Sequence, residues 1–347
     1  MKKIYISLIF LFCTVLTFSQ HIDWQKNIKS NTQDYLSQLI VTFDNQYLII
    51  GSSINTKNNT TITENSPTNT GYDYHLIKLN QEGVTVWEKY YGGLSHDYLT
   101  ATAATQDSGF ILAGTSYSAK GVNKSEDCYG SSDVWLIKIT EDGNEEWQKS
   151  IGGSSGEEAR AVIQTNDLQY IVASDINTGI GGKRGYGSKD LWLVKLDEDG
   201  NPVKETIIGG KGLDEIEKII PTEDGGCLIA VYSRSHSSED IKLTSTDVSI
   251  LNQIKEPSRS FSITQSNLYS ENNTTIANIN KKNYNNINTE IFPKTSVNYG
   301  EGDYWIIKID KNLKIEWQKN YGGSGDDHIR NINRTDNGYF ISGESAS

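Results

Sequence analysis

Short apolar runs of five to eight residues recur along the chain, and polar turns that contain Asp, Asn or Gly separate them. Runs of this length, rich in β-branched and aromatic residues and bounded by turn residues, are typical of β-strands. One of them, LWLVKL at 191–196, is apolar at both of its alternating sets of positions. A strand of this kind is buried on both faces. The pattern therefore predicts an all-β protein in which small sheets lie face to face.

The apolar runs belong to a repeated unit. The stretch DVWLIKITEDGNEEWQKSIGG that begins at Asp133 recurs in related form from Asp73, Asp190 and Asp303. An acidic residue follows the second Trp position of this stretch by ten residues in every copy, and a threonine follows it by eighteen. Self-similarity of this kind indicates a repeat architecture. All seven tryptophans occupy two positions of the unit, namely Trp24, Trp87, Trp135, Trp147, Trp192, Trp305 and Trp317.

Each unit predicts four short strands. Strand A runs from the acidic residue to the threonine, and a tight turn leads to strand B, as in GFILAG at 109–114. A loop of variable length precedes strand C, which begins with the D-x-W motif, and a short turn leads on to strand D. Four antiparallel strands per repeat, buried between similar repeats, are typical of a β-propeller blade. We therefore predict a β-propeller of four-stranded antiparallel blades, with about four full blades and a partial one.

The tryptophans have a structural interpretation in this fold. We expect them to wedge between neighbouring blades rather than to form an exposed sugar-stacking surface. On this view, replacing Trp147 with alanine would cost about 3–5 kcal/mol, as for a buried aromatic residue.

The repeats extend over residues 20–347, with units near 24–86, 87–146, 147–203 and 204–316 and a partial unit at 317–347. The longest B–C segment, about 233–301, is rich in Asn, Ser, Thr and Lys. This composition predicts a polar, mobile insertion; a decayed blade is the alternative. Because the chain stops after a strand B, we expect a C-terminally incomplete fragment. The alternative is a closed ring of five blades, one of them three-stranded.

The first 19 residues have the pattern of a signal peptide. Lys2 and Lys3 precede an apolar run from Ile4 to Leu16, which is too short to span a bilayer. Small residues predict cleavage near Ser19/Gln20, and we expect a secreted or outer cell-surface protein without membrane insertion. The net charge of −12 makes nucleic acid a poor partner. Two cysteines remain, Cys128 and Cys227, which we expect to be thiols, with a disulfide as the alternative.

Several stretches match a known repeat pattern, namely WQKSIGG (147–153), WQKNYGG (317–323), DLWLVKLD (190–197) and DYWIIKID (303–310). They resemble a family of secreted repeat proteins from Gram-negative bacteria that use type IX secretion. The resemblance covers nearly all of residues 22–347. It implies a propeller-like fold and an extracellular or cell-surface location, but no settled activity.

The repeated acids are the first candidates for chemistry: Asp34, Asp97, Glu157, Asp214 and Asp327. A ring of five carboxylates near one mouth of the channel could hold Ca²⁺ or supply paired acids for glycoside hydrolysis. We favour the alternative that each acid binds backbone N–H groups within its own unit, because an active site is seldom repeated in every unit. The Asp of each D-x-W motif (Asp73, Asp133, Asp190 and Asp303) has the same interpretation. No other metal, cofactor or catalytic motif is predicted.

The variable loops are the expected functional surface, since loops on a rigid scaffold commonly hold binding residues. Five tyrosines lie in or beside them: Tyr72, Tyr117, Tyr129, Tyr186 and Tyr299. Polar loops with tyrosines suit a glycan or protein ligand. We therefore expect a non-catalytic binding or adhesion scaffold. The alternative is a propeller enzyme, or an accessory domain of one, that acts on polysaccharide. Such an enzyme should have one blade that breaks the pattern, whereas the copies differ mainly in loop length.

Overall fold

The computed structural model describes residues 22–28, 33–54, 71–177, 185–235 and 289–346, which contain strands and turns but no helix. Nowhere in these residues is there a helix that could cross a membrane. The predicted signal peptide lies outside them. The strands are β1 (Asp34–Val41), β2 (Tyr47–Ser53), β3 (Asp73–Leu79), β4 (Thr85–Tyr91), β5 (Asp97–Ala104), β6 (Phe110–Ser116), β7 (Asp133–Ile139), β8 (Glu145–Ile151), β9 (Glu157–Gln164), β10 (Tyr170–Ile176), β11 (Asp190–Leu196), β12 (Pro202–Gly209), β13 (Asp214–Pro221), β14 (Cys227–Ser233), β15 (Thr289–Pro293), β16 (Asp303–Ile309), β17 (Ile315–Tyr321), β18 (Asp327–Thr335) and β19 (Gly338–Ser345).

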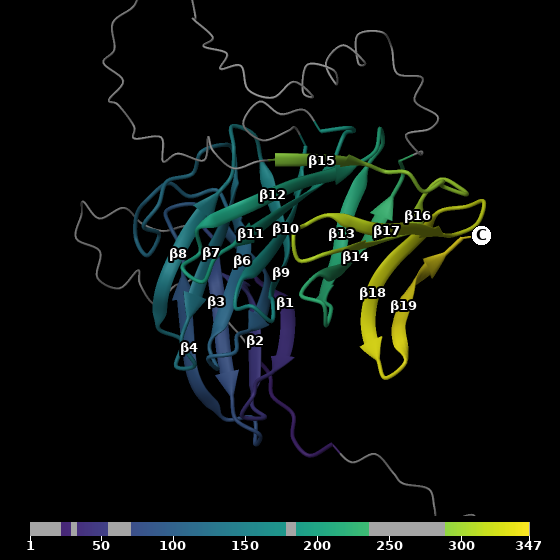
Figure 1. The fold of residues 1–347 in the computed structure, drawn as a ribbon. Coiled ribbons are helices and arrows are strands. Elements are labelled where there is room, and N and C mark those ends of the chain that lie inside the picture. Colours follow the sequence, from purple (N-terminus) through teal and green to yellow (C-terminus); the bar gives the residue numbers. More distant parts are fainter. Residues whose placement is uncertain (1–21, 29–32, 55–70, 178–184, 236–288, 347) are drawn as a thin grey trace, which may run out of the picture.

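The strands form the predicted blades (Figure 1). Blade 1 is β1-β2-β3-β4, blade 2 is β5-β6-β7-β8, blade 3 contains β9 to β12, and blade 4 is β13-β14-β16-β17. Neighbouring strands of each blade are antiparallel in the order A, B, C, D. A two-stranded sheet, β18-β19, supplies the A and B strands of a further blade. The predicted all-β propeller fold, with four full blades and a partial one, is confirmed.

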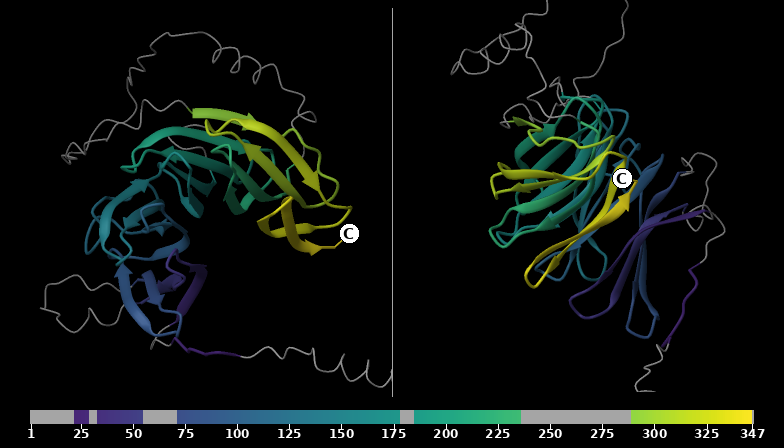
Figure 2. Two further views of the ribbon diagram at one scale, coloured as in Figure 1. Left: turned by 60° about the horizontal axis from the view of Figure 1, so that its bottom comes forward. Right: turned by 90° about the vertical axis from the view of Figure 1, so that its right-hand side faces the viewer.

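The blades stand side by side along an arc (Figure 2). Successive A strands pack against each other, β1 on β5, β5 on β9, β9 on β13 and β13 on β18. The arc is open between β1 and the β18–β19 hairpin. The described residues therefore do not form the closed five-bladed ring that was the alternative.

The apolar core lies between the blades rather than within any one of them. Leu48 and Leu76 of blade 1 pack in one cluster with Leu112 and Ile137 of blade 2, and similar clusters join the later blades. Strands β7 and β11 are buried along their whole length. This confirms the prediction that both faces of strand C are covered, since blades 2 and 3, which contain β7 and β11, each have a neighbour on both sides.

The tryptophans fall into two groups with different surroundings. Trp135, Trp192 and Trp305 of the C strands are 0%, 4% and 0% exposed. The strand D tryptophans are less buried, and each of three lies over the Asp-Gly or Glu-Gly turn of the following blade. A Cβ on Gly200, for example, would lie 2.7 Å from the ring of Trp147. Trp147 is half-buried and packs against the apolar cluster of blades 2 and 3, so it lies between these blades but is less buried than the expected cost of about 3–5 kcal/mol assumes.

The long insertion is partly ordered. β15 pairs in parallel with β12 and adds a fifth strand to blade 3. Just after it, the buried Lys294 donates from Nζ to Ser233 Oγ (2.6 Å) and Ser235 O (2.8 Å). The prediction of a mobile excursion over 233–301 is therefore wrong for residues 289–301, and these residues form no sheet of their own. Residues 236–288 lie outside the described part of the chain.

The Gly-Gly sequence after strand D has a steric reason, which gives a testable prediction. A Cβ on Gly152 would lie 2.4 Å from Asp133 Oδ1 and 2.6 Å from Glu157 Oε2, both buried. We expect Gly152→Ala to lower the free energy of unfolding by about 1–3 kcal/mol, as other overpacked sites do. Urea denaturation followed by circular dichroism would measure the change. A loss below about 0.5 kcal/mol, the range of neutral surface changes, would contradict it.

Candidate functional site

The A strands line the concave side of the arc, and their alternate side chains have different surroundings. The first and third residues of β5, β9 and β13 are buried, whereas the second and fourth are partly exposed. The exposed positions of neighbouring blades contact each other, as described below, and we call them the inner wall. They are Tyr35 and Ser37 of β1, Tyr98 and Thr100 of β5, Glu158 and Arg160 of β9, Glu215 and Glu217 of β13, and His328 and Arg330 of β18.

The inner wall of blades 1 and 2 is aromatic. The rings of Tyr35 and Tyr98 lie 6.4 Å apart with their planes at 75°. Tyr72, which precedes β3, lies 5.1 Å from Tyr35 and 5.5 Å from Tyr98. His96 stacks on Tyr98 at 5.8 Å, and Tyr117 meets the same ring edge-on at 6.3 Å. We call these five residues the tyrosine cluster.

A hollow of about 410 Å³ opens beside the tyrosine cluster, lined by Tyr35, Ser37, Ser52, Tyr98, Leu99 and Thr100. Its sides are phenol rings and its remaining lining is mostly hydroxyl groups. Tyr35 is 45% exposed. Rings with an apolar face and a polar edge suit ligands that present both apolar surface and hydrogen-bonding groups. The hollow is therefore a candidate binding site on the inner wall.

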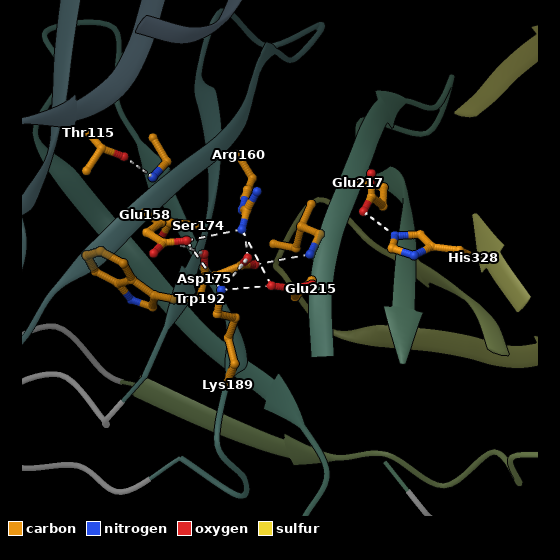
Figure 3. Close-up of polar contacts among 12 residues, drawn as sticks. Thr115, Glu158, Arg160, Ser174, Asp175, Lys189, Trp192, Glu215, Glu217 and His328 are labelled. Atoms are coloured by element: carbon orange, nitrogen blue, oxygen red, sulfur yellow. Dashed lines mark hydrogen bonds and ion pairs between the residues drawn. The ribbon is translucent and has the colours of Figure 1, made fainter. Parts of the chain in front are cut away.

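The inner wall of blades 3 and 4 is ionic (Figure 3). Arg160 Nε donates to Asp175 Oδ2 at 2.7 Å, and its Nη2 lies 3.1 Å from Glu158 Oε2 and 3.7 Å from Glu215 Oε1. Lys189 Nζ, from the residue before β11, lies 2.8 Å from Glu215 Oε1 and 3.3 Å from Glu158 Oε2. We call these five residues the ionic cluster. Two cations meet three carboxyl groups, and one of the three, Asp175, is buried.

Asp175 shows how this cluster arises from the repeat. It occupies the strand B position of Ser52 and Thr115, and all three side chains bridge to the backbone of the next blade. The bonds run from Leu99 N to Ser52 Oγ (2.9 Å), from Ala159 N to Thr115 Oγ1 (3.0 Å) and from Ile216 N to Asp175 Oδ1 (3.1 Å). Burial raises the pKa of Asp175 to about 7, although Arg160 opposes that shift. Blade 3 thus keeps the bridge and adds an ionisable carboxyl group.

The ionic character continues into β18. His328 Nε2 lies 3.0 Å from Glu217 Oε1 (Figure 3). The His328 ring also stacks on Tyr232 at 4.0 Å, and the Tyr232 hydroxyl donates to Asp326 Oδ1 at 2.7 Å. The wall therefore changes along the arc from tyrosines to paired charges.

The acids repeated in every unit lie elsewhere. Asp97, Glu157, Asp214 and Asp327 are at most 2% exposed, whereas Asp34 is exposed. Each buried acid accepts a backbone N–H from the Gly-rich connection before its strand, from Gly93 (2.7 Å), Gly153 (2.9 Å), Gly210 (2.8 Å) and Gly323 (2.6 Å) respectively. This is the backbone-bonding role that the repeat favours. Among the described residues, no three His, Cys, Asp or Glu side chains form a group that could hold a metal ion.

The D-x-W aspartates face the same connections from the preceding blade. Asp73, Asp133, Asp190 and Asp303 are at most 3% exposed. Burial, with the charge of Asp133 nearby, raises the pKa of Glu157 to about 7. Burial, with the charge of Asp214 nearby, raises the pKa of Asp190 to about 7. Each blade junction thus brings two buried carboxylates together.

Other predicted residues are spread over the surface. Of the five loop tyrosines, only Tyr72 and Tyr117 join the tyrosine cluster. Tyr129 and Tyr299 each donate a backbone N–H to the D-x-W aspartate four residues later, and Tyr186 lies at the equivalent place in blade 3. Cys128 and Cys227 are free thiols, as expected, and no disulfide joins them.

Sequence reasoning missed the inner wall because it compared the copies for what they share. Two positions that differ between the copies lie one and three residues after the repeated acid: Tyr and Ser, Tyr and Thr, Glu and Arg, Glu and Glu, and His and Arg in the five copies. The copies therefore differ on the exposed face of strand A as well as in loop length. Alternate residues of a strand point to the same face, so these two positions could have been placed on one surface from the sequence alone.

Comparisons with known proteins add little to this picture. No known protein family and no curated protein matches the chain. Among solved structures, a protein of unknown function from Bacteroides caccae is 10% identical, with 86% of this chain and 85% of that chain covered and a TM-score of 0.26. A mannose phosphorylase from Leishmania mexicana, in complex with phosphate ion, is also 10% identical, with 90% and 80% covered and a TM-score of 0.36. Similarities this weak support no conclusion about function.

Proposed function

We propose that this propeller is a secreted or cell-surface binding module that holds a glycan or protein ligand on its inner wall without catalysing a reaction. The proposal rests on one observation: the blades share their junction residues but differ at the inner wall. Shared residues such as the Gly-bonded acids maintain the scaffold. Residues that change from blade to blade on a common exposed surface have no such structural role and are available for recognition.

The tyrosine cluster supports a binding role. Exposed tyrosines on rigid strands supply contact area at a small cost in conformational entropy. Five of the residues that line the 410 Å³ hollow come from two neighbouring A strands, namely Tyr35, Ser37, Tyr98, Leu99 and Thr100. The hollow therefore has a framework that is fixed before a ligand arrives.

The alternative of an enzyme that acts on polysaccharide has less support. Glycoside hydrolysis requires an acid with a raised pKa that reaches the substrate. Burial raises the pKa of Glu157, Asp175 and Asp190 to about 7. These side chains are at most 1% exposed, so a substrate on the wall would not reach them.

Replacing Tyr98 with alanine tests the proposal. Glycan and peptide arrays would first identify a bound probe, and affinity for that probe would then be measured for each variant. We expect Tyr98→Ala to weaken binding about tenfold or more, since a stacked aromatic residue contributes on the order of 1–2 kcal/mol. Tyr321→Ala is the matched control, because Tyr321 is 47% exposed on the outer strand β17. Equal binding by both variants, or blank arrays, would contradict a binding role for the inner wall.

A further inference from the structure

We propose that the ligand of the inner wall is an extended protein segment with lysine or arginine side chains. This inference rests on the proposed binding function and adds the chemical class of the ligand. It comes from the electrostatics of the ionic cluster and from the rings of the tyrosine cluster, which favour the same kind of ligand independently.

The cations of the ionic cluster are already engaged. Arg160 contacts the carboxylates of Glu158, Asp175 and Glu215 through Nε and Nη2. Lys189 Nζ lies within 4.0 Å of the same three carboxylates. The carboxylates have spare capacity, because both cations contact Oε2 of Glu158 and Oε1 of Glu215. Each glutamate thus keeps a second oxygen that bonds to nothing else in the described part of the chain. An anionic ligand would find no unengaged cation there, whereas a cationic ligand would find two acceptors.

These acceptors are accessible. The side chains of Glu158 and Glu215 are 41% and 25% exposed. Glu217, on the next exposed position of β13, is 24% exposed and contacts His328, which is uncharged unless protonated. The wall of blades 3 and 4 therefore presents a negative potential to a ligand, in keeping with the net charge of −12 of the whole chain.

The tyrosine cluster favours the same ligand class. The face of a phenol ring attracts a guanidinium or ammonium group, and this attraction increases when the cation is partly desolvated. Tyr35 and Tyr98 both line the hollow, with their ring planes at 75° to each other. A basic side chain in the hollow would therefore meet both phenol rings.

An extended segment fits the wall better than a small amine or a neutral sugar. The A strands of all four blades pack in succession, so the tyrosine and ionic clusters lie on adjacent strands of one surface. A small amine would contact only one cluster. A neutral glycan would stack on the tyrosines but would bring no positive charge to the second oxygens of Glu158 and Glu215. A peptide with several basic side chains contacts both.

The test compares three fluorescent probes of similar length: hexa-arginine, hexa-glutamate and cellohexaose. Affinities would be measured with the full chain at low salt and at physiological salt. The double variant Glu158→Gln/Glu215→Gln leaves Arg160, Lys189 and Asp175, which reverses the sign of the cluster. We expect it to bind hexa-arginine about tenfold more weakly and to gain affinity for hexa-glutamate. The control Glu82→Gln/Glu198→Gln removes the same charge from exposed C–D turns at the other end of the blades and should bind hexa-arginine within about twofold of wild type.

The outcomes separate this inference from the proposed function. Equal weakening in the two double variants would show that hexa-arginine senses only the net charge, and would overturn the inference. Binding of cellohexaose but not hexa-arginine, lost in Tyr98→Ala, would overturn it while leaving the binding function intact. If no probe or array ligand depends on Tyr98, the proposed function itself fails. Glu217 does not belong to the ionic cluster, and we expect Glu217→Gln to weaken hexa-arginine binding as well. This variant therefore provides the test if Glu158→Gln/Glu215→Gln does not fold.

Discussion

Replacing Trp135 with alanine is expected to lower the free energy of unfolding by about 3–5 kcal/mol, the range for large buried aromatic residues. Trp135 is fully buried between blades 1 and 2, with the Tyr74 ring 4.8 Å away and Lys124 Nζ 5.9 Å from its centroid. Its Nε1 donates to Gln148 Oε1 at 3.1 Å. Removal would leave a cavity at a blade interface, whereas Gln148 Oε1 would keep the hydrogen bond that it accepts from Ser125 N at 2.8 Å. Urea denaturation of the full chain, followed by circular dichroism, measures the loss.

The strand D tryptophans supply the control for this prediction. Trp147→Ala removes a half-buried ring that packs on Gly200 and meets Tyr170 edge-on at 5.7 Å. We expect it to cost about 1–2 kcal/mol, since partial burial removes less apolar surface from water. Trp317 is 40% exposed, and its replacement should cost less than about 1 kcal/mol. Equal losses at Trp135 and Trp147 would contradict the assignment of two different roles.

The strands could be predicted from the sequence because each depends on local patterning that neighbouring blades reinforce. In LWLVKL both faces are apolar, and in the structure both faces meet another blade. The Asp-Gly turn at Asp142 requires a positive φ, which Gly143 supplies at 72°. Gly83 and Gly200 supply the same positive φ in blades 1 and 3, whereas Leu313 adopts it in blade 4. Pattern and turn chemistry thus agree on strand position in three blades, and such agreement between levels specifies a fold.

The features that escaped prediction depend on contacts that no local pattern encodes. β15 pairs with β12 across a connection of about 80 residues, so nothing near Thr289 signals its partner. The burial of Lys294 is equally non-local, because its acceptors belong to the end of β14 and the residues just after it. The open arc is a property of how blades stack, which strand patterns do not fix.

The candidate site divides in the same way. The repeated acids could be interpreted as backbone ligands because their position in every unit argues for a shared structural role. The inner wall depends on single residues such as Asp175, where blade 3 has a carboxylate in place of a serine or threonine. That exchange is visible in the sequence. Its consequence depends on Arg160 and Lys189, which lie beside Asp175 only because β9, β10 and β11 are neighbours in one sheet.

The stability of the protein is expected to decrease as the pH rises from about 4 to about 7, because of the carboxylates at the blade junctions. Burial, with the charge of Asp133, raises the pKa of Glu157 from 4.5 to about 7. Burial, with the charge of Asp214, raises the pKa of Asp190 from 3.8 to about 7. Between those values the folded state binds protons that the unfolded state has released, so unfolding becomes easier as the pH increases. The decrease ends near the folded-state pKa, above which both states are ionised.

Replacing these acids with their amides should remove the decrease. Each pKa unit corresponds to about 1.4 kcal/mol, so Glu157→Gln and Asp190→Asn should each be more stable than wild type at pH 8 by about that amount or more, and at pH 5 by less. Asp142→Asn, in an exposed turn, is the control.

Below pH 4 the stability is expected to fall as the pH falls. Hydrogen bonds from Lys308 and Thr222 lower the pKa of Asp224 to about 2. The stability that Asp224 contributes is therefore lost as the pH approaches that value. Maximum stability therefore belongs near pH 4–5, and a maximum above pH 7 in the wild-type protein would show that the junction carboxylates remain ionised in the fold.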